Sequence, residues 1–361
     1  MEKTVGIGIV GAGFARRVQI PAFSQCEGAR LVSVSSGTLA NAKAAAEEFD
    51  IEHFSNDWRE TIARDDVDLV CITTPPNLHR EMVLAALDAG KHILAEKPMA
   101  MNVAEAEEMT DAAKGKSVLA LIDHELRFLP GRQKAYQMLR DGVIGKVLHA
   151  KYDLRAPHRA DPAVPWNWWS DIEAGGGALG AINSHVIDSF NWFLGTEISS
   201  VYCQLQTHIK QRLNNGEMRD VTTDDEANML LRFTDSELTS DATGIVSVSM
   251  IEGPEYVNKI EFVGTEGWMR VGHRGDVQIA KRGETEMTVV DVEYPPSISG
   301  VFESGFPSGF MAFAPKIIEA IRNGSTKIEH AATFEDGLSV QRVLDAARES
   351  STNGARTLLS A

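Results

Sequence analysis

The N-terminal third of the chain alternates continuously apolar runs with stretches of helical period. The apolar runs predict strands at Val5–Val10, Leu31–Ser35, Val67–Thr73, His92–Ala95 and Val118–Ile122. The stretches between them predict helices at Phe14–Gln25, Ala40–Phe49, Asp57–Ala63, Leu78–Ala89 and Val103–Lys114. Strand–helix alternation indicates a parallel, doubly wound sheet, and continuous apolar runs are typical of strands covered on both faces.

The pattern changes near Asp123 to a meander of strands with a few helices, which predicts a second α/β domain with a large, mostly antiparallel sheet. The predicted strands are Lys146–Arg155, Ser200–His208, Ala227–Thr234, Gly244–Met250, Asn258–Val263, Trp268–Val271 and Val277–Ala280. The predicted helices are Pro130–Asp141, Gly180–Leu194, Ala314–Arg322 and Phe334–Glu349, and Asn214–Asp225 is expected to be a polar loop. We place the domains at 1–122 and 123–361, with the 334–349 helix able to pack back on the first domain.

The length, net charge and cysteine content of the chain limit the classes of protein to which it can belong. A length of 361 residues suits roughly two domains at about 150 residues each. A net charge of −16 disfavours binding to nucleic acid or an anionic membrane surface. Three widely spaced cysteines, Cys26, Cys71 and Cys203, form neither a disulfide framework nor a zinc pattern, so no metal site is expected. The start of the chain lacks the features of a secretion signal, so we expect a cytoplasmic protein.

A glycine-rich turn follows the first predicted strand. Its sequence is Gly11-Ala12-Gly13-Phe14-Ala15-Arg16. The first glycine allows the tight turn from strand to helix, and the second allows a pyrophosphate to approach the backbone. The helix N-terminus then offers N–H groups to the anion. We therefore predict a Rossmann-type dinucleotide-binding domain, although Arg16 stands where the motif usually has Gly or Ala.

The second strand carries the signal for cofactor choice. Such strands usually end in an acidic residue that binds the ribose 2′-hydroxyl. Here the predicted strand is followed by Ser36-Gly37-Thr38 without a carboxylate, and Lys43 is the nearest cation that follows. We expect NADP or NAD, with a lean towards NADP; the alternative for this segment is a simple capping turn.

Two later segments make the chain resemble a known family. They are Cys71-Ile72-Thr73-Thr74-Pro75-Pro76-Asn77-Leu78-His79 and Gly90-Lys91-His92-Ile93-Leu94-Ala95-Glu96-Lys97-Pro98. Together with the glycine turn and a later Gly175-Gly176-Gly177…His185…Asp188 segment, they resemble the Gfo/Idh/MocA oxidoreductases. The resemblance implies hydride transfer between NAD(P) and a carbohydrate, polyol or related ring alcohol. It also implies a homodimer or homotetramer that forms through the open sheet face.

The resemblance assigns site residues near the nicotinamide. These are Thr73, Pro75, Asn77 and His79, with Glu96 and Lys97 beside them. The position of Lys97 directly after an apolar strand agrees with this, because Pro98 restricts its backbone and the side chain can be aimed. A cation there could hold a substrate hydroxyl and stabilise the developing alkoxide. The alternative is a solvent-exposed lysine.

His185 is the second catalytic candidate. Many members of the family carry Asp four residues before this histidine, where this chain has Ala181. We predict that His185 binds substrate and is the general base, since an imidazole titrates near ~6.5. Asp188 is the nearest residue in sequence that could orient it. The alternative is a packed core histidine on a partly apolar helix.

Two further residues are candidates for the substrate pocket. Arg127 follows the last parallel strand, and a structural ion pair is an equal alternative for it. Trp168 lies before the glycine run and could wall a sugar pocket, although core packing is an alternative for the tryptophans in this segment.

The predicted function is an NAD(P)-dependent oxidoreductase acting on a secondary alcohol or ketone of a sugar, cyclitol or related polyol. Two alternatives remain open. One is a glycosidase of the same fold that uses NAD transiently, and the other is a non-catalytic regulator that senses the nucleotide. The sequence does not identify the substrate.

Overall fold

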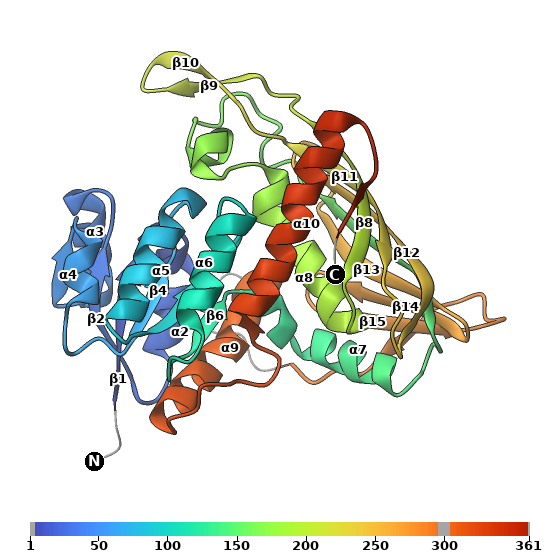
Figure 1. The fold of residues 1–361 in the computed structure, drawn as a ribbon, viewed down its shortest axis with the longest axis horizontal. Helices are drawn as coiled ribbons and strands as arrows, with labels where there is room; N and C mark the ends of the chain where they lie inside the picture. The colour runs from blue at the N-terminus through green and yellow to red at the C-terminus, as the bar shows by residue number, and fades with distance from the viewer. Residues whose placement is uncertain (1–3, 295–303, 360–361) are drawn as a thin grey trace. The chain divides into compact units, whose positions relative to one another are not determined.

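The computed structural model describes residues 4–294 and 304–359, and Figure 1 shows its fold. The chain divides into two compact units, Met1–Phe128 with Pro296–Leu338 and Leu129–Pro295 with Ser339–Ala361. The boundary thus follows Phe128 rather than Ile122, and each unit contains a distant C-terminal segment. Residues 1–3, part of the N-terminal segment considered above, lie outside the described residues.

Unit 1 contains a doubly wound sheet with strand order β17-β6-β5-β4-β1-β2-β3. The five predicted strands are confirmed, and β1 to β6 run parallel. The strands are β1 (Val5–Val10), β2 (Ala29–Ser35), β3 (His53–Ser55), β4 (Leu69–Ile72), β5 (His92–Ala95), β6 (Ala120–Ile122) and antiparallel β17 (Ala332–Thr333). The sequence did not indicate β3, because three residues of mixed polarity form no apolar run.

The helices of unit 1 cover both sheet faces. They are α1 (Gly13–Arg17), α2 (Gln19–Ser24), α3 (Leu39–Phe49), α4 (Trp58–Ile62), α5 (His79–Asp88), α6 (Val103–Ala113) and α9 (Gly305–Arg322), with 3-10 turns η1 (Pro76–Leu78) and η2 (Glu125–Phe128). One apolar core includes α4, α5 and α6, the last two lying side by side in Figure 1, and another includes α2 and α9. The single helix predicted at Phe14–Gln25 is broken at Val18, because Pro21 has no N–H to donate to the carbonyl of Arg17.

Helix α9 is the C-terminal segment that packs within unit 1. Phe310 meets Phe23 edge to face, with ring centroids 5.4 Å apart, and Phe313 stacks on Phe128 at 4.1 Å. These buried aromatic contacts explain why a helix so late in the chain belongs to the first sheet. Of α10 (Phe334–Asn353), which includes the predicted 334–349 helix, Phe334–Leu338 lie in unit 1 and the remainder lies in unit 2.

Unit 2 contains a nine-stranded sheet with order β16-β15-β14-β13-β7-β12-β11-β8-β18. All its strand pairs are antiparallel except β7 with β12. The strands are β7 (Val147–Arg155), β8 (Ile198–Gln206), β11 (Glu226–Phe233), β12 (Thr239–Ser249), β13 (Val257–Gly264), β14 (Gly267–Gly272), β15 (Val277–Lys281), β16 (Thr288–Val290) and β18 (Thr357–Leu358). The predicted class of both sheets is therefore confirmed.

One face of the second sheet is covered by helices. Its core includes α7 (Pro130–Arg140), α8 (Ser184–Leu194) and residues 339–353 of α10. The segment expected to be a polar loop at Asn214–Asp225 instead contains most of a hairpin, β9 (Gln211–Asn214) with β10 (Glu217–Asp220). Its strands are almost entirely polar, so hydrophobic periodicity could not reveal them.

The three cysteines are free thiols, of which Cys71 and Cys203 are buried. Among the described residues, no helix is both long and apolar enough to cross a membrane.

Candidate functional site

The first sheet has its topological switch point between β1 and β4. From β1 the chain proceeds to β2 on one side, whereas β4 pairs with the other side. Open α/β sheets bind ligands outside the carboxyl ends of the strands at such a point. The glycine turn follows β1 and the Thr73–Pro75 segment follows β4, so the topology brings these two predicted segments together.

The two glycines of the turn have different surroundings. Gly11 has φ +104°, and a Cβ there would lie 2.6 Å from the carbonyl oxygen of Thr73. Gly13 begins α1, is exposed, and a Cβ there would meet nothing within 4 Å. Gly11 is therefore required by the fold, whereas Gly13 leaves open space at a helix N-terminus, which is the cradle that a pyrophosphate needs. The residues present fit a dinucleotide.

The other residues predicted around this turn separate into buried and exposed positions. Ala15 is fully buried against the sheet and Phe14 is half-buried. Arg16 is exposed and forms an ion pair with Glu48 of α3. Ser36 is half-buried, and its N–H donates to the carbonyl of Ser55. No carboxylate follows β2 at positions 36–38, as the sequence showed.

Hydrogen bonds to the backbone of neighbouring segments hold the segment after β4 in place. The Thr73 hydroxyl donates to the carbonyl of Gly11, and Pro75 is half-buried while Asn77 is exposed. His79 is fully buried, with Nε2 2.9 Å from the carbonyl of Thr74 and Nδ1 3.2 Å from that of Pro98. Both ring nitrogens are thus engaged with backbone oxygens. His79 thus links the segments that follow β4 and β5, and its contact with the cofactor stays a prediction.

Lys97 follows β5 through Glu96, and its peptide bond to Pro98 is cis. Its side chain is 20% exposed, and Nζ lies 3.9 Å from Oε2 of the buried Glu96. Two residues not identified from the sequence complete this group: Nε2 of Gln19 donates to Oε1 of Glu96 at 3.2 Å and to Oδ2 of Asp123 at 2.8 Å. The segment after β5 therefore carries the partly exposed ammonium of Lys97 beside the buried Glu96, which Gln19 links to the buried Asp123.

Arg127 is engaged in a structural ion pair. Its guanidinium is 5% exposed and donates to Oδ1 of Asp336 at 3.0 Å and to the carbonyl of His330 at 3.3 Å. Burial would raise the pKa of Asp336, but Arg127 and hydrogen bonds from Thr333 hold it below its ordinary value. Of the two interpretations offered by the sequence, the contacts favour the ion pair over the substrate pocket.

In unit 2, the glycine run begins the segment that carries His185. A π-helical turn at Leu179–Asn183 leads into α8. A Cβ on Gly176 would lie 2.5 Å from the carbonyl oxygen of Trp168, and one on Gly177 would clash with Asp224. The carboxylate of Asp224 accepts from the N–H of Leu179 at 2.7 Å, and burial raises its pKa to about 6. The glycines thus allow an acid, unrecognised in the sequence, to bind the start of this helical segment.

His185 itself lies on α8 and is 3% exposed. Its carbonyl accepts from the hydroxyl of Ser189 at 2.6 Å, and Ser189 accepts from Arg132 at 2.7 Å. Asp188 is also buried on this helix, and Ala181 lies in the π-helical turn. The backbone of His185 is therefore fixed, but its role as a base stays a prediction.

Polar groups without partners lie directly before His185. Asn183 and Ser184 are fully buried, and neither amide atom of Asn183 nor the hydroxyl of Ser184 has a hydrogen-bond partner in the described part of the chain. Such groups are rare in folded proteins and require an explanation. No sequence signal identified them, since their burial depends on the tertiary structure.

Trp168 lies in a 3-10 turn and is half-buried, with its ring centroid 5.9 Å from that of Trp169. The neighbouring Trp166 donates from Nε1 to the carbonyl of Asp220 in the β9–β10 hairpin. Arg159 lies over Trp169 at 5.3 Å. Trp168 therefore keeps partial exposure, and its contact with a substrate stays a prediction.

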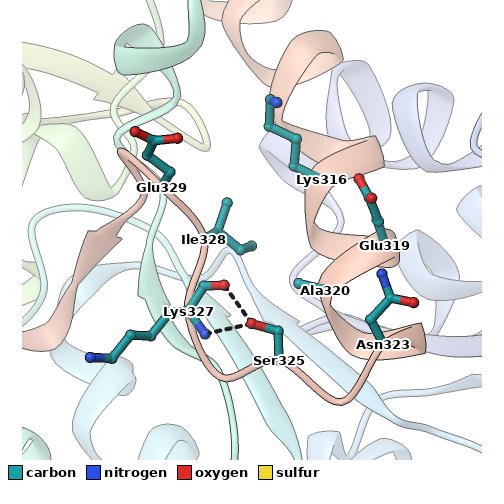
Figure 2. Close-up of a pocket in the computed structure, with 8 residues that line it drawn as sticks. All are labelled: Lys316, Glu319, Ala320, Asn323, Ser325, Lys327, Ile328 and Glu329. Carbon is teal, nitrogen blue, oxygen red and sulfur yellow. Dashed lines mark hydrogen bonds between the residues drawn. The ribbon is translucent and has the colours of Figure 1, made fainter.

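A surface hollow of about 240 Å³ lies elsewhere in unit 1, beside the C-terminal part of α9 (Figure 2). Lysines and glutamates both line it, and Figure 2 shows Lys327 extending away from α9. The hydroxyl of Ser325 is bonded to the backbone of Lys327. None of the predicted site residues lies here, and we assign it no ligand.

The switch point, the open glycine turn and the lysine at the end of β5 define an NAD-binding oxidoreductase of the Rossmann type. Residues 5–124 match the model of the oxidoreductase family with an NAD-binding Rossmann fold. Residues 132–270 match the GFO/IDH/MocA C-terminal domain. The chain therefore belongs to the Gfo/Idh/MocA family, and it is an enzyme of the NAD-binding oxidoreductase class.

Individual relatives agree with this assignment. The chain is 32% identical over 269 residues to an uncharacterised oxidoreductase of Synechocystis, covering 74% of this chain and 71% of that protein. It is 30% identical over 303 residues to levoglucosan dehydrogenase of Pseudarthrobacter phenanthrenivorans, covering 77% and 76%. A solved structure of levoglucosan dehydrogenase with NADH and L-sorbose has a TM-score of 0.88 at 28% identity and covers 99% of each chain.

Proposed function

We propose that this protein is a dehydrogenase that oxidises a secondary alcohol of a sugar, anhydrosugar or cyclitol with a nicotinamide nucleotide. The observation that carries the proposal is the order β5-β4-β1, which sets Lys97 two strands away from the open position beside Gly13. Bound nucleotide supplies the hydride acceptor. Every other role falls to side chains of this chain.

In unit 1, the Lys97 ammonium donates a hydrogen bond to the reacting hydroxyl and stabilises the alkoxide as hydride leaves. Partial exposure lets Nζ reach a ligand, and the carboxylate of Glu96 lies 3.9 Å from it on the protein side. In unit 2, His185 is the proposed general base, with a ring nitrogen as the proton acceptor. Asp188 on the same helix is the proposed orienting group, in place of the carboxylate that Ala181 lacks. Asn183 and Trp168 are proposed to contact substrate.

The test is a steady-state screen of sugars, anhydrosugars and cyclitols with NAD⁺ and with NADP⁺, read as reduced nicotinamide. Levoglucosan and L-sorbose are the first compounds to test in this screen, because solved structures of levoglucosan dehydrogenase contain them. We expect net cofactor reduction with at least one compound, slowed by ~10²-fold or more in Lys97→Ala. Cleavage of an aryl glycoside without net cofactor reduction would instead support a glycosidase.

Cofactor choice follows from the end of β2. The absence of a carboxylate at positions 36–38 removes repulsion of a 2′-phosphate, which favours NADP(H). The nearby cations Arg16 and Lys43 already pair with Glu48 and Glu47, so a phosphate must compete with these carboxylates. The preference for NADPH stays a prediction. Fluorescence titration that gives a lower dissociation constant for NADH would contradict it.

We also infer that the open face of the second sheet joins copies of this chain. Tyr202, Leu230 and Ile245 pair across β8, β11 and β12, and they are 41%, 54% and 42% exposed. A continuous apolar row of this kind is typical of an interface. Light scattering should give a dimer or tetramer for the wild type and smaller species for Leu230→Asp. Leu213→Asp, an exposed leucine in the hairpin, is the matched control, and an unchanged mass for Leu230→Asp would refute this face.

A further inference from the structure

Two carboxylic acids are brought together by strand register in unit 1. β5 and β6 are parallel, and Ala95 pairs with Ile122 at the end of both strands. The next residues are Glu96 and Asp123, and the N–H of Asp123 donates to the carbonyl of Ala95 at 2.8 Å. The two side chains therefore leave adjacent strand ends at the same level of the sheet.

One amide bridges the two acids. The side-chain nitrogen of Gln19, on α2, lies 3.2 Å from Oε1 of Glu96 and 2.8 Å from Oδ2 of Asp123. Gln19 and Asp123 are fully buried and Glu96 is 8% exposed. Because an amide nitrogen carries two hydrogens, it can donate one to each acid and hold both in a fixed geometry.

Two adjacent carboxylates in a buried place cannot both be ionised without a large cost. Burial, together with the nearby Glu125 and Glu96, raises the pKa of Asp123 well above its ordinary value. Burial also raises the pKa of Glu96, but the Lys97 cation opposes this effect. Burial, together with the charges of Asp123 and Glu96, raises the pKa of the Cys71 thiol on β4, so this thiol remains neutral. Asp123 is therefore the acid that keeps the proton.

A second observation agrees with a protonated Asp123. Its Oδ1 has no hydrogen-bond partner in the described part of the chain, although it is fully buried. A buried anionic oxygen without a partner would be costly. A carboxylic acid instead has a hydroxyl that can donate to the neighbouring Glu96.

We propose that Asp123 is a positioning residue for Lys97: it shares one proton with Glu96, so that the pair presents a single negative charge to the Lys97 ammonium. Gln19 holds the pair, and Oε2 of Glu96 remains 3.9 Å from Nζ. The positioning role of Asp123 in catalysis rests on the proposed function of Lys97. The sharing of a proton between Asp123 and Glu96 does not depend on that function.

The first test is independent of activity. Infrared spectra of the nucleotide-free protein at neutral pH should contain the carbonyl band of a buried protonated carboxylic acid. Asp123→Asn should remove that band and Asp111→Asn, an exposed acid on α6, should keep it. Absence of the band in the wild type, or its persistence in Asp123→Asn, would overturn the proposal.

The second test is the pH dependence of unfolding. A carboxyl with a raised pKa in the folded state binds more protons there than in the unfolded chain. Stability therefore falls as pH rises from the unfolded pKa towards the folded one. The difference between wild type and Asp123→Asn should show this slope, because asparagine cannot lose a proton. Identical slopes for the two proteins would contradict a shared proton.

The third test concerns positioning. Asparagine is neutral and its amide can donate to Glu96, so Asp123→Asn should lose far less than the ~10²-fold typical of a proton-transfer group. Its turnover should also persist to higher pH than that of the wild type. Glu96→Gln, which removes the charge beside Lys97, should lower kcat more than Asp123→Asn does. A loss in Asp123→Asn as large as that in Lys97→Ala, or an unshifted alkaline limb, would refute positioning. If no substrate is found, the first two tests still decide the shared proton.

Discussion

Two glycines, two residues apart, should respond in opposite ways to a side chain. At Gly13 a Cβ meets no atom within 4 Å and the backbone is helical, so Gly13→Val should fold normally. Helix propensities place valine slightly above glycine, so the change in stability should stay within about 1 kcal/mol. At Gly11, φ +104° alone costs about 1–3 kcal/mol for alanine. The 2.6 Å approach to the Thr73 carbonyl adds to that cost.

Ligand-induced stabilisation separates the two effects. NADH at 100 times its dissociation constant stabilises a folded protein by about 2.7 kcal/mol. For a unit of this size, each kcal/mol raises Tm by about 2–4 °C, so the wild type should gain roughly 5–11 °C. Gly13→Val should start at the wild-type Tm and gain nothing, because its branched side chain fills the space for the pyrophosphate. Gly11→Ala should start lower.

The assay is differential scanning fluorimetry with and without NADH, and with NADPH in parallel. A Gly13→Val protein that keeps the full Tm gain would show that the open space is not where the pyrophosphate binds. A Gly11→Ala protein as stable as the wild type would show that the close approach to Thr73 can relax at no cost.

Three further substitutions test individual residues. Lys97→Ala should lower kcat by ~10²–10⁴-fold, which is the range of a charge-stabilising or proton-transfer group. The dissociation constant for NADH should change little. A loss in kcat of under ~10-fold, outside that range, would make Lys97 a structural residue. His185→Asn should be slow and lack the acidic limb that the wild-type pH–rate profile of alcohol oxidation is expected to show, and a variant that keeps both would make His185 a packing residue. Arg127→Gln should lower the free energy of unfolding by about 1–3 kcal/mol, because it leaves the partly buried carboxylate of Asp336 without its cation. The pKa of Asp336 is lowered in the fold, so this pair stabilises above the unfolded pKa and is lost as pH falls through the folded one. Denaturant unfolding at neutral and acidic pH should therefore show a smaller difference between wild type and Arg127→Gln in acid.

The local sequence was sufficient for most elements of both sheets and for the glycine turn. Apolar runs and helical periods extend over a few residues, and strand–helix alternation allows few topologies. The turn was identifiable because only glycine adopts the backbone of Gly11 easily. The family resemblance assigned the site to the segments that follow β4 and β5, and both lie at carboxyl ends of parallel strands, where open α/β sheets bind ligands.

The role of each polar residue was decided by its tertiary partners. His79 lies in a recognisable motif, yet both its ring nitrogens bind backbone oxygens. Arg127 pairs with an acid 209 residues away in sequence. Asp123 acquires its neighbour through the register of β5 with β6, and Gln19 reaches both acids from the first position of α2. Secondary structure follows from short-range sterics and hydrophobic periodicity, both of which depend on residues close together in the sequence. The charge state and the contacts of a side chain depend instead on its burial and on strand pairing between distant segments.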